Sequence, residues 1–399
     1  ARVIARSEPL KETPTGVAAK PLAPIAQPTE RPIPPGFVFL AAGILGFVFM
    51  QMELIWYRLL GPLLGGSTYT LGLILAMALL GIGLGGSAYA LRSRGSQPTL
   101  RAFALTCGVE ACFMAVPYAL GDRVAVLSAL LHPIGQIGLG GQVIGWFFIA
   151  GVVVFPAAVV SGYQFPLLIG LLGRGEEKVG RHTGQAYASN TGGAIAGSLA
   201  GGFILLPLLT ATGSWKLMIV LLSILCGTVV LLSLRREKWS GLLVLPAGAV
   251  ACALLLLLAS GPTAAWRHSP IGAGRADLMG LTRNGIEEWI RFVRRTTIWN
   301  AEGREVSLGL SASDGLAFVG NGKIDGNAKN DAPTQVMLGL VSAVLHPGPK
   351  TAMVIGMGTG SSAGWLADIE SIKRVDVSEI EPDVIEVARR CAPVNRNVL

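Results

Sequence analysis

Three glycines at alternate positions, Gly356, Gly358 and Gly360, follow the apolar stretch TAMVI near the end of the chain. An apolar strand that runs into a glycine-rich turn is typical of a nucleotide-binding loop, because glycine lets the backbone approach the ligand closely. The dinucleotide fingerprint places its third glycine one residue later, where this chain has Ser361. The spacing therefore predicts a nucleotide loop but does not require a pyrophosphate.

A single acid after the next strand refines this prediction. Glu379 lies 19 residues beyond Gly360, at the end of the stretch KRVDVSE, and a carboxylate there accepts two hydrogen bonds from a ribose diol. The combination favours a nucleoside without phosphates, such as S-adenosylmethionine or a relative of it. The alternative is a tight strand-helix turn beside a surface glutamate. Because the four histidines and five cysteines are scattered, we expect neither a metal site nor a disulfide framework.

A parallel sheet is needed to position this loop. The strand Thr351 to Gly356 is followed by a helix near 361–370, and the strand that ends at Glu379 is followed by a helix from about Pro382 to Arg390. This βαβα series predicts that the two strands run parallel.

Further elements are expected ahead of the sheet. Ala332 to His346 has helical periodicity, and Asn330 and Asp331 are the expected capping residues. Before this helix, the stretches RRTTIWNAEG, REVSLGLSAS and GLAFVGNGK predict three short strands, with turns at Glu302-Gly303 and Asp314-Gly315.

Most of the chain has the composition of a membrane protein. Of its 399 residues, 51% are hydrophobic and only 14% are charged, whereas soluble domains average roughly 25% charged residues. The stretch 123–140 contains Arg123, His132 and several glycines, so we expect it to be interfacial or a broken helix. With it, residues 37–260 should form about seven or eight helices. The apolar segments long enough to cross a bilayer are roughly 37–60, 67–91, 100–120, 142–172, 183–209, 215–234 and 241–259.

Small and polar residues inside these segments indicate packed helices. Glycines four residues apart form a flat stripe where two backbones approach closely, and they occur at Gly81 and Gly85 and again at Gly193, Gly197 and Gly201. Charged and amide side chains inside a span normally face the bundle interior. They indicate either a transport path or, as we favour, helix-helix clamps. These side chains are Glu53, Arg58, Glu110 and Asn190.

The two ends of the chain differ from this middle part. Residues 1–36 are rich in Pro, Ala, Thr and basic residues and are expected to form a disordered tail. We expect residues 261–330 to be a small β-strand region and residues 331–399 to be the start of an α/β domain. The net charge of +8 is attributed to membrane loops and not to nucleic-acid binding.

Basic residues in three loops indicate an orientation. They cluster near residues 92–101, 174–181 and 235–238, and all three loops fall on one side if 123–140 does not cross. The positive-inside rule makes that side cytoplasmic. The segment 241–259 would then carry the chain to the opposite side, away from the cytosol.

Several longer motifs resemble one family, the spermidine synthase-like polyamine aminopropyltransferases fused to a multispanning membrane domain. The match covers nearly all of residues 37–399. In the membrane part it is carried by ELIWYR, FPAAVVSGYQFPLL and VGRHTGQAYASNTGGAIAGSLAGGFILLP. In the C-terminal part it is carried by WRHSPIGAGR, NGKIDG, DAPTQVMLGLVSAVLHP, VIGMGTG and SEIEPDVIEVA.

The resemblance implies a fold and a reaction. A small β-sheet would cover the site, and a Rossmann-like domain of the S-adenosylmethionine-dependent transferase type, incomplete in this chain, would hold decarboxylated S-adenosylmethionine. An aminopropyl group would pass to a diamine such as putrescine, leaving methylthioadenosine, with no metal. Asp331 falls where the family has an acid before the helix and is assigned to substrate binding. Carried over by motif, the donor-binding residues are Gln335, Gly356, Gly358, Thr359, Gly360 and Glu379.

Two departures from the family pattern bear on activity. Soluble members have an Asp in the glycine loop that faces the donor amino group, and this chain has Thr359 there. The family's catalytic Asp belongs to a later strand end, so we expect it beyond Leu399 and assign no catalytic residue.

Three functions remain open from the sequence. The first is a membrane-anchored aminopropyltransferase, the second a catalytically degenerate synthase-like protein with a sensing or assembly role, and the third a polyamine or cation transporter. The expected partners are the lipid bilayer, a polyamine, and a second copy or a larger membrane complex. We expect a multi-pass protein of a cell inner membrane. Its soluble part should be cytoplasmic, because the resemblance implies a donor that is made in the cytosol.

Overall fold

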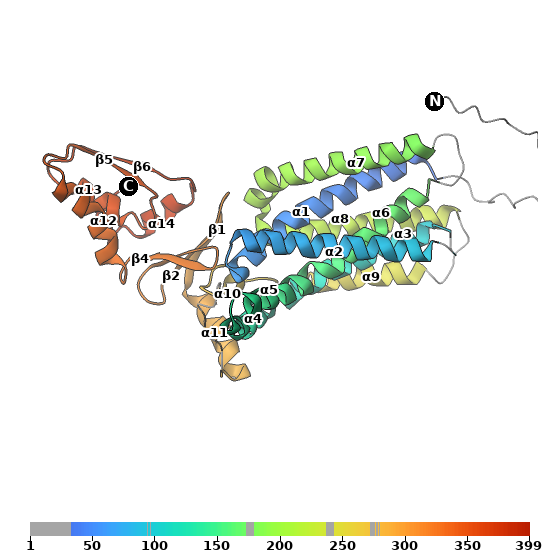
Figure 1. Ribbon diagram of the computed structural model, residues 1–399, viewed down its shortest axis with the longest axis horizontal. Coiled ribbons are helices and arrows are strands. Elements are labelled where there is room, and N and C mark those ends of the chain that lie inside the picture. The colour runs from blue at the N-terminus through green and yellow to red at the C-terminus, as the bar shows by residue number, and fades with distance from the viewer. Residues whose placement is uncertain are drawn as a thin grey trace, which may run out of the picture. The chain divides into compact units, whose positions relative to one another are not determined.

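The computed structural model describes residues 33–93, 95, 97–172, 179–236, 243–271, 276, 278 and 280–399 (Figure 1). Of the tail predicted for residues 1–36, residues 1–32 lie outside the described residues. The first helix begins at Pro35, so the ordered helical part starts close to the predicted boundary.

The N-terminal part is helical throughout the residues described. Helices α7 and α8 are joined by a short π-helix, η2, and Thr210 interrupts α8 with φ 62° and ψ 171°. The elements are α1 (Pro35–Leu64), α2 (Thr68–Arg92), α3 (Leu100–Leu120), α4 (Asp122–Leu131), η1 (His132–Ile137), α5 (Leu139–Val153), α6 (Phe155–Gly170), α7 (Val179–Ala200), η2 (Gly201–Leu205), α8 (Leu206–Arg236) and α9 (Val244–Leu256).

Several of these helices are long and apolar enough to cross a membrane. Among the described residues they are α1, α2, α3 and the helical run Gly180–Arg235, and α5 with α6 adds a further span if this pair, bent by 53°, crosses as one. The run Gly180–Arg235 contains the break at Thr210, and Figure 1 shows α7 and α8 as separate ribbons. By length and composition, the described residues therefore contain four helical segments that could cross a membrane, or up to five with the bent pair.

Two of the predicted segments, 123–140 and 241–259, have different outcomes. The stretch 123–140 was expected to be interfacial or broken, and it contains the 10-residue helix α4, the 3-10 helix η1 and the start of α5. The predicted span 241–259 is wrong in extent. The described helix there, α9, has 13 residues and is about 20 Å long, which is shorter than the roughly 30 Å hydrocarbon core.

The predicted glycine stripes are confirmed as close helix contacts. A Cβ atom added at Gly85 of α2 would overlap the Val159 carbonyl of α6. A Cβ atom added at Gly193 of α7 would overlap the Gly43 carbonyl of α1, and one at Gly197 would overlap Phe47 of the same helix. The pairs α2–α6 and α1–α7 therefore depend on the absence of side chains at these positions.

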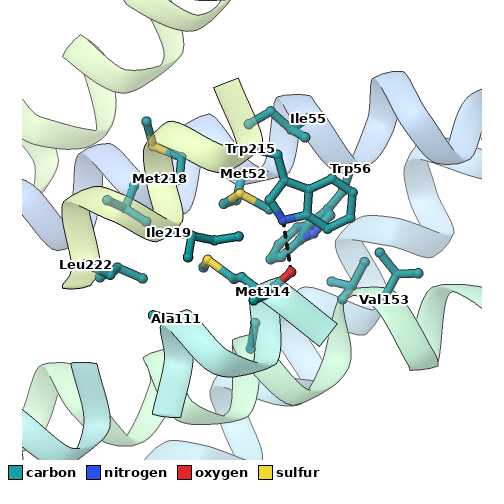
Figure 2. Close-up of a cluster of buried hydrophobic side chains, with 14 of the residues drawn as sticks. Met52, Ile55, Trp56, Ala111, Met114, Val153, Trp215, Met218, Ile219 and Leu222 are labelled. Carbon is teal, nitrogen blue, oxygen red and sulfur yellow. Dashed lines mark hydrogen bonds between the residues drawn. The ribbon is translucent and has the colours of Figure 1, made fainter. Parts of the chain in front are cut away.

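Large side chains fill the bundle where glycine is absent. Figure 2 shows Trp215 of α8 pointing toward α3, where its Nε1 donates to the Met114 carbonyl oxygen at 3.1 Å. Met52 and Trp56 of α1 lie around the same point and are fully buried. Satisfying the indole N–H inside the core avoids the penalty of an unpaired buried donor.

Two of the polar residues of the bundle, Asn190 and Arg58, form contacts between elements. Asn190 of α7 donates from Nδ2 to the Ala42 carbonyl oxygen of α1 at 3.0 Å, which agrees with a helix-helix clamp. Glu110 of α3 is 2% exposed. Arg58 of α1 reaches out of the bundle and donates to backbone carbonyls at residues 303 and 304.

A four-stranded antiparallel sheet follows the bundle, with the strand order β1-β2-β3-β4 among the described residues. The predicted first strand began too early, because Arg294 and Arg295 belong to the helix before it. The fourth strand was not predicted. It follows a two-residue hairpin at Asn321 (φ 45°) and Gly322 (φ 77°), and an Asn-Gly pair is the sequence signal for such a turn. The elements are α10 (Ala264–Arg267), α11 (Arg283–Thr296), β1 (Thr297–Glu302), β2 (Ser307–Ser311), β3 (Ala317–Gly320) and β4 (Lys323–Asn327).

The last part of the chain has the predicted βαβα order. The two strands pair in parallel, from Thr351 opposite Arg374 to Ile355 opposite Ser378. Helix α13 is shorter than the predicted 361–370. The elements are α12 (Ala332–Leu345), β5 (Thr351–Ile355), α13 (Ser361–Ala367), β6 (Arg374–Ser378) and α14 (Val384–Arg390).

Candidate nucleoside-binding site

The glycine loop joins the end of β5 to the start of α13. Gly356, Gly358 and Gly360 have φ values of 88°, 52° and 81°, a region that strains residues with a Cβ atom. The Gly356 N–H donates to the Ser378 carbonyl oxygen at 2.8 Å, and the Gly360 N–H donates to the Met357 carbonyl oxygen at 2.8 Å. The loop therefore needs glycine for its backbone conformation, and it is anchored to β6.

Glu379 lies directly against this loop, as its position after β6 predicts. Its Oε2 atom accepts the Met357 N–H at 2.6 Å, and its Oε1 atom accepts the Glu381 N–H at 2.9 Å. The side chain is half-buried. Each carboxylate oxygen has a second lone pair, so Glu379 retains acceptor capacity for a ligand while it holds the loop.

Gln335 and Thr359 form the opposite side of the loop. The Thr359 hydroxyl donates to Gln335 Oε1 and lies 3.0 Å from Ser361 Oγ, and Ser362 Oγ donates to the Gln335 carbonyl oxygen at 2.5 Å. Thr359 is 4% exposed. These bonds attach the glycine loop to the first turn of α12 and fix the Gln335 side chain.

A cavity of about 460 Å³ opens between the loop, α12, β5 and the β3–β4 hairpin. Four of the predicted donor-binding residues line it, whereas Gly360 and Glu379 do not. Asp325 of β4 also lines it and was not singled out from the sequence, since β4 itself was not predicted. Its side chain is 39% exposed, and it forms an ion pair with Lys323 at 3.3 Å. The predicted residues on the lining are Gln335, Gly356, Gly358 and Thr359.

Asp331 is placed at the start of α12, but its side chain is used locally. Its Oδ2 atom accepts the Asn327 N–H at 2.8 Å, and it makes no capping hydrogen bond to α12. Asn330 donates from Nδ2 to Asp314 Oδ2 at 2.7 Å. The capping prediction is therefore wrong for both side chains, because the Asn327 N–H takes the Asp331 carboxylate and Asp314, between β2 and β3, takes the Asn330 amide. Substrate binding by Asp331 stays a prediction.

A second acid, Glu381, faces away from the loop. It is 2% exposed, and its Oε2 atom accepts the Glu305 N–H in the β1–β2 turn at 2.8 Å. Burial raises the pKa of nearby Asp383, with a further contribution from the Glu381 charge, while Arg304 acts in the opposite direction. Glu381 thus ties the end of β6 to the antiparallel sheet.

Comparison with curated proteins supports the resemblance read from the motifs. The chain is 28% identical over 391 residues to a protein of Streptomyces coelicolor described as Polyamine aminopropyltransferase 2, and the match covers 94% of this chain. The chain spans 63% of that protein's length. No protein-family model matches the chain, and no solved structure matches it. The resemblance to a spermidine synthase-like protein with an apolar helical region is confirmed.

Proposed function

We propose that the chain is a membrane-anchored, spermidine synthase-like protein whose C-terminal part binds the nucleoside portion of decarboxylated S-adenosylmethionine. The observation that supports this proposal most directly is the glycine loop, which hydrogen bonds hold between Glu379 and Gln335. The cavity beside it has a volume within the roughly 300–1,000 Å³ range of small-molecule sites. Glycines at Gly356 and Gly358 leave open space around their α-carbons, which a ligand can approach.

The residues present fit the binding of a neutral sugar and base. Gln335 lines the cavity with an amide, and Glu379 stands at the strand end where a ribose diol is expected. When bound, the donor supplies an activated sulfonium carbon. The protein must then orient an amine toward that carbon and accept a proton. Asp325 is an acid on the cavity wall that can attract the cationic end of donor or acceptor.

Thr359 supports a second candidate, a synthase-like domain that binds without transfer. The hydroxyl is buried and bonded to Gln335 and Ser361. A neutral, already bonded hydroxyl provides no negative charge for the donor's ammonium group. A role in sensing or assembly is the function that fits binding without turnover.

We also propose that the C-terminal part faces the cytoplasm of a cell inner membrane, since the resemblance implies a cytosolic donor. The basic loops favour the opposite orientation. Helix α2 is about 37 Å long, and Arg92 is its last residue. Gly66, just before the start of α2, lines a cavity with Arg304 of the antiparallel sheet. Arg92 therefore lies at the end of α2 that is away from the sheet. Protease cleavage near Gly303 in sealed, oriented vesicles distinguishes the two orientations of the C-terminal part. Cleavage only from the periplasmic face contradicts the cytoplasmic proposal.

Calorimetric titration of methylthioadenosine into the purified chain tests the nucleoside site. Saturable binding is expected, with ATP as the control that should bind more weakly because the loop lacks the pyrophosphate spacing. An absence of binding overturns the proposal.

A second assay, with decarboxylated S-adenosylmethionine and putrescine, distinguishes an enzyme from a binding domain. We expect no methylthioadenosine to be formed by residues 1–399 alone.

The assembly state is a separate proposal. We propose that the chain contacts a second copy or a larger membrane complex through its C-terminal part. Exposed apolar side chains support this, including Met353 and Ile355 on β5, which are 67% and 87% exposed. The mass of the protein extracted into lipid nanodiscs tests it, and a strictly monomeric particle contradicts it.

A further inference from the structure

A second cavity, of about 210 Å³, lies where the helical bundle meets the antiparallel sheet. Its walls come from the second half of α1, from η2 and the start of α8, and from the turns of the sheet. The residues on these walls that carry the argument are Tyr57, Arg58, Gly61, Gly202, Arg304 and Asn321. It is separate from the nucleoside site, since the two cavities share no lining residue.

Arg58 is the central cation of this cavity. Its Nη2 atom donates to the carbonyl oxygens of Gly303 and Arg304 at 2.9 and 2.7 Å. Its Nη1 atom is buried and has no hydrogen-bond partner among the described residues. Within the same residues, Arg58 also forms no ion pair with an acid. The Arg58 side chain as a whole is half-buried, and its positive charge lacks a counter-charge.

The other polar groups on the walls leave this positive charge in excess. Arg304 and Glu305 are both exposed and oppose each other in charge. Tyr57 is 39% exposed and adds a phenol that can donate a hydrogen bond. Among the described residues, Glu305 is the one acid on these walls, and it forms no ion pair with Arg58. Two arginines against one carboxylate leave the walls with a net positive charge.

Local helix geometry keeps this space open. A Cβ atom built at Gly61 or at Gly202 would meet nothing within 4 Å, so both glycines border empty volume. Gly202 belongs to the π-helix η2, and π-helical turns are frequent at functional sites. The cavity also lies near the C-terminal end of α1, a helix long and apolar enough to span a membrane, so we expect it at the level of the lipid headgroups.

We propose that this cavity binds a phosphate group, presented by the headgroup of an anionic phospholipid or by a free phosphate. Arginine forms paired hydrogen bonds with phosphate oxygens, and basic pockets between membrane helices bind anionic headgroups. Arg58 lines the cavity beside its bonds to the Gly303 and Arg304 carbonyl oxygens and supplies the central positive charge. The Tyr57 hydroxyl supplies a donor, and Arg304 at the rim adds charge. The ligand neutralises this charge and links the bundle to the sheet.

Native mass spectrometry of the full chain in detergent tests this proposal. The protein is titrated with phosphatidylglycerol, with phosphatidylcholine and, separately, with inorganic phosphate. We expect phosphatidylglycerol to bind at least about tenfold more tightly than phosphatidylcholine. Arg58→Gln should weaken phosphatidylglycerol binding at least about tenfold, since one charge-assisted bond is worth about 1.4 kcal/mol or more. Saturable binding of inorganic phosphate with the same dependence on Arg58 identifies a soluble ligand instead, and also supports the site.

A second variant keeps the test valid if Arg58→Gln does not fold. Gly61→Leu places a side chain in the cavity without changing any charge, and it should reduce phosphatidylglycerol binding by a similar factor. Gly83→Leu on α2 is its matched control, because a Cβ atom at Gly83 also meets nothing within 4 Å. Arg283→Gln removes an exposed arginine elsewhere. Equal binding of both phosphatidylglycerol and phosphate by wild type, Arg58→Gln and Gly61→Leu overturns the proposal.

Discussion

The bundle and the C-terminal βαβα unit use glycine for different physical reasons. In the bundle, Gly85 and Gly193 lie in regular helix, and what matters is the neighbouring backbone that a side chain would strike. In the glycine loop, a Cβ atom added at Gly356 or Gly358 would meet nothing within 4 Å, and what matters is a positive φ. The same residue type therefore reports packing in one region and backbone conformation in the other.

The largest effect should come from a steric substitution in the bundle. Gly193→Val places a branched side chain on the Gly43 carbonyl, and we expect the free energy of unfolding to fall by about 3 kcal/mol. Thermal unfolding in detergent measures it. Gly192→Val is the matched control, because a Cβ atom at Gly192 meets nothing within 4 Å. If both variants lose the same stability, helix propensity and not close approach explains the stripe.

The segment between the two regions should respond to pH. Burial, with a smaller contribution from Arg267, lowers the pKa of His268 to about 3, whereas the unfolded chain protonates it near pH 6.5. Below pH 6.5 the unfolded state therefore binds the additional proton. The stability that comes from burying neutral His268 is complete above that pH. As the pH falls toward 3, the free energy of unfolding decreases by about 1.4 kcal/mol per pH unit.

The measurement compares unfolding of wild type and His268→Gln at pH 7.5 and 5.0. Wild type should lose about 2 kcal/mol more than the variant over this range. An identical pH dependence of the two proteins would show that His268 is protonated as easily in the folded state as in the unfolded one.

An effect of about tenfold is expected at Glu379. Hydrogen bonds to a charged acceptor contribute roughly 1.5–3 kcal/mol, so Glu379→Ala should weaken methylthioadenosine binding at least about tenfold. Glu381→Ala should matter less, because Glu381 points to the β1–β2 turn. Calorimetric titration gives all three affinities. Equal values for wild type and Glu379→Ala contradict a ribose contact.

The smallest effect should come from the conformational glycine. Gly358→Ala adds one methyl group in open space at φ 52°, so only backbone strain of about 1 kcal/mol is expected. Gly348→Ala, which also has open space but no positive φ, is the control. Denaturant unfolding followed through the C-terminal part measures both. A loss well above that of Gly193→Val would reverse the distinction between the regions.

Residue spacing along the sequence was sufficient to predict a structural feature where a single helix or strand determines that feature. Glycines four residues apart fall on one helix face whatever the helix contacts, so the stripes at Gly81 and Gly193 were predictable. The same holds for Glu379, because a residue at the end of a parallel strand must lie beside the loop of its neighbour. The order of the βαβα unit follows from alternation of apolar strands and helices.

Other features depend on competition between neighbours and were missed. Asp331 precedes a helix, but the Asn327 N–H takes its carboxylate. Asp325 reaches the nucleoside cavity only because the Asn321–Gly322 hairpin turns β4 back beside β3. The length of α9 and the meeting of Arg58 with the β1–β2 turn are likewise set by tertiary packing, which no local pattern encodes.

The turn between β1 and β2 is held from two directions, and this affects how the protein should be handled. Arg58 of α1 donates to two carbonyl oxygens of the turn, and the Glu381 carboxylate accepts an N–H from it. Glu381 is bonded in turn to Glu379, which holds Met357 in the glycine loop. Helix α1 and the glycine loop are thus joined by successive hydrogen bonds. We therefore expect the affinity for methylthioadenosine to differ between detergent and a bilayer, and the solubilising medium belongs among the variables of any binding assay.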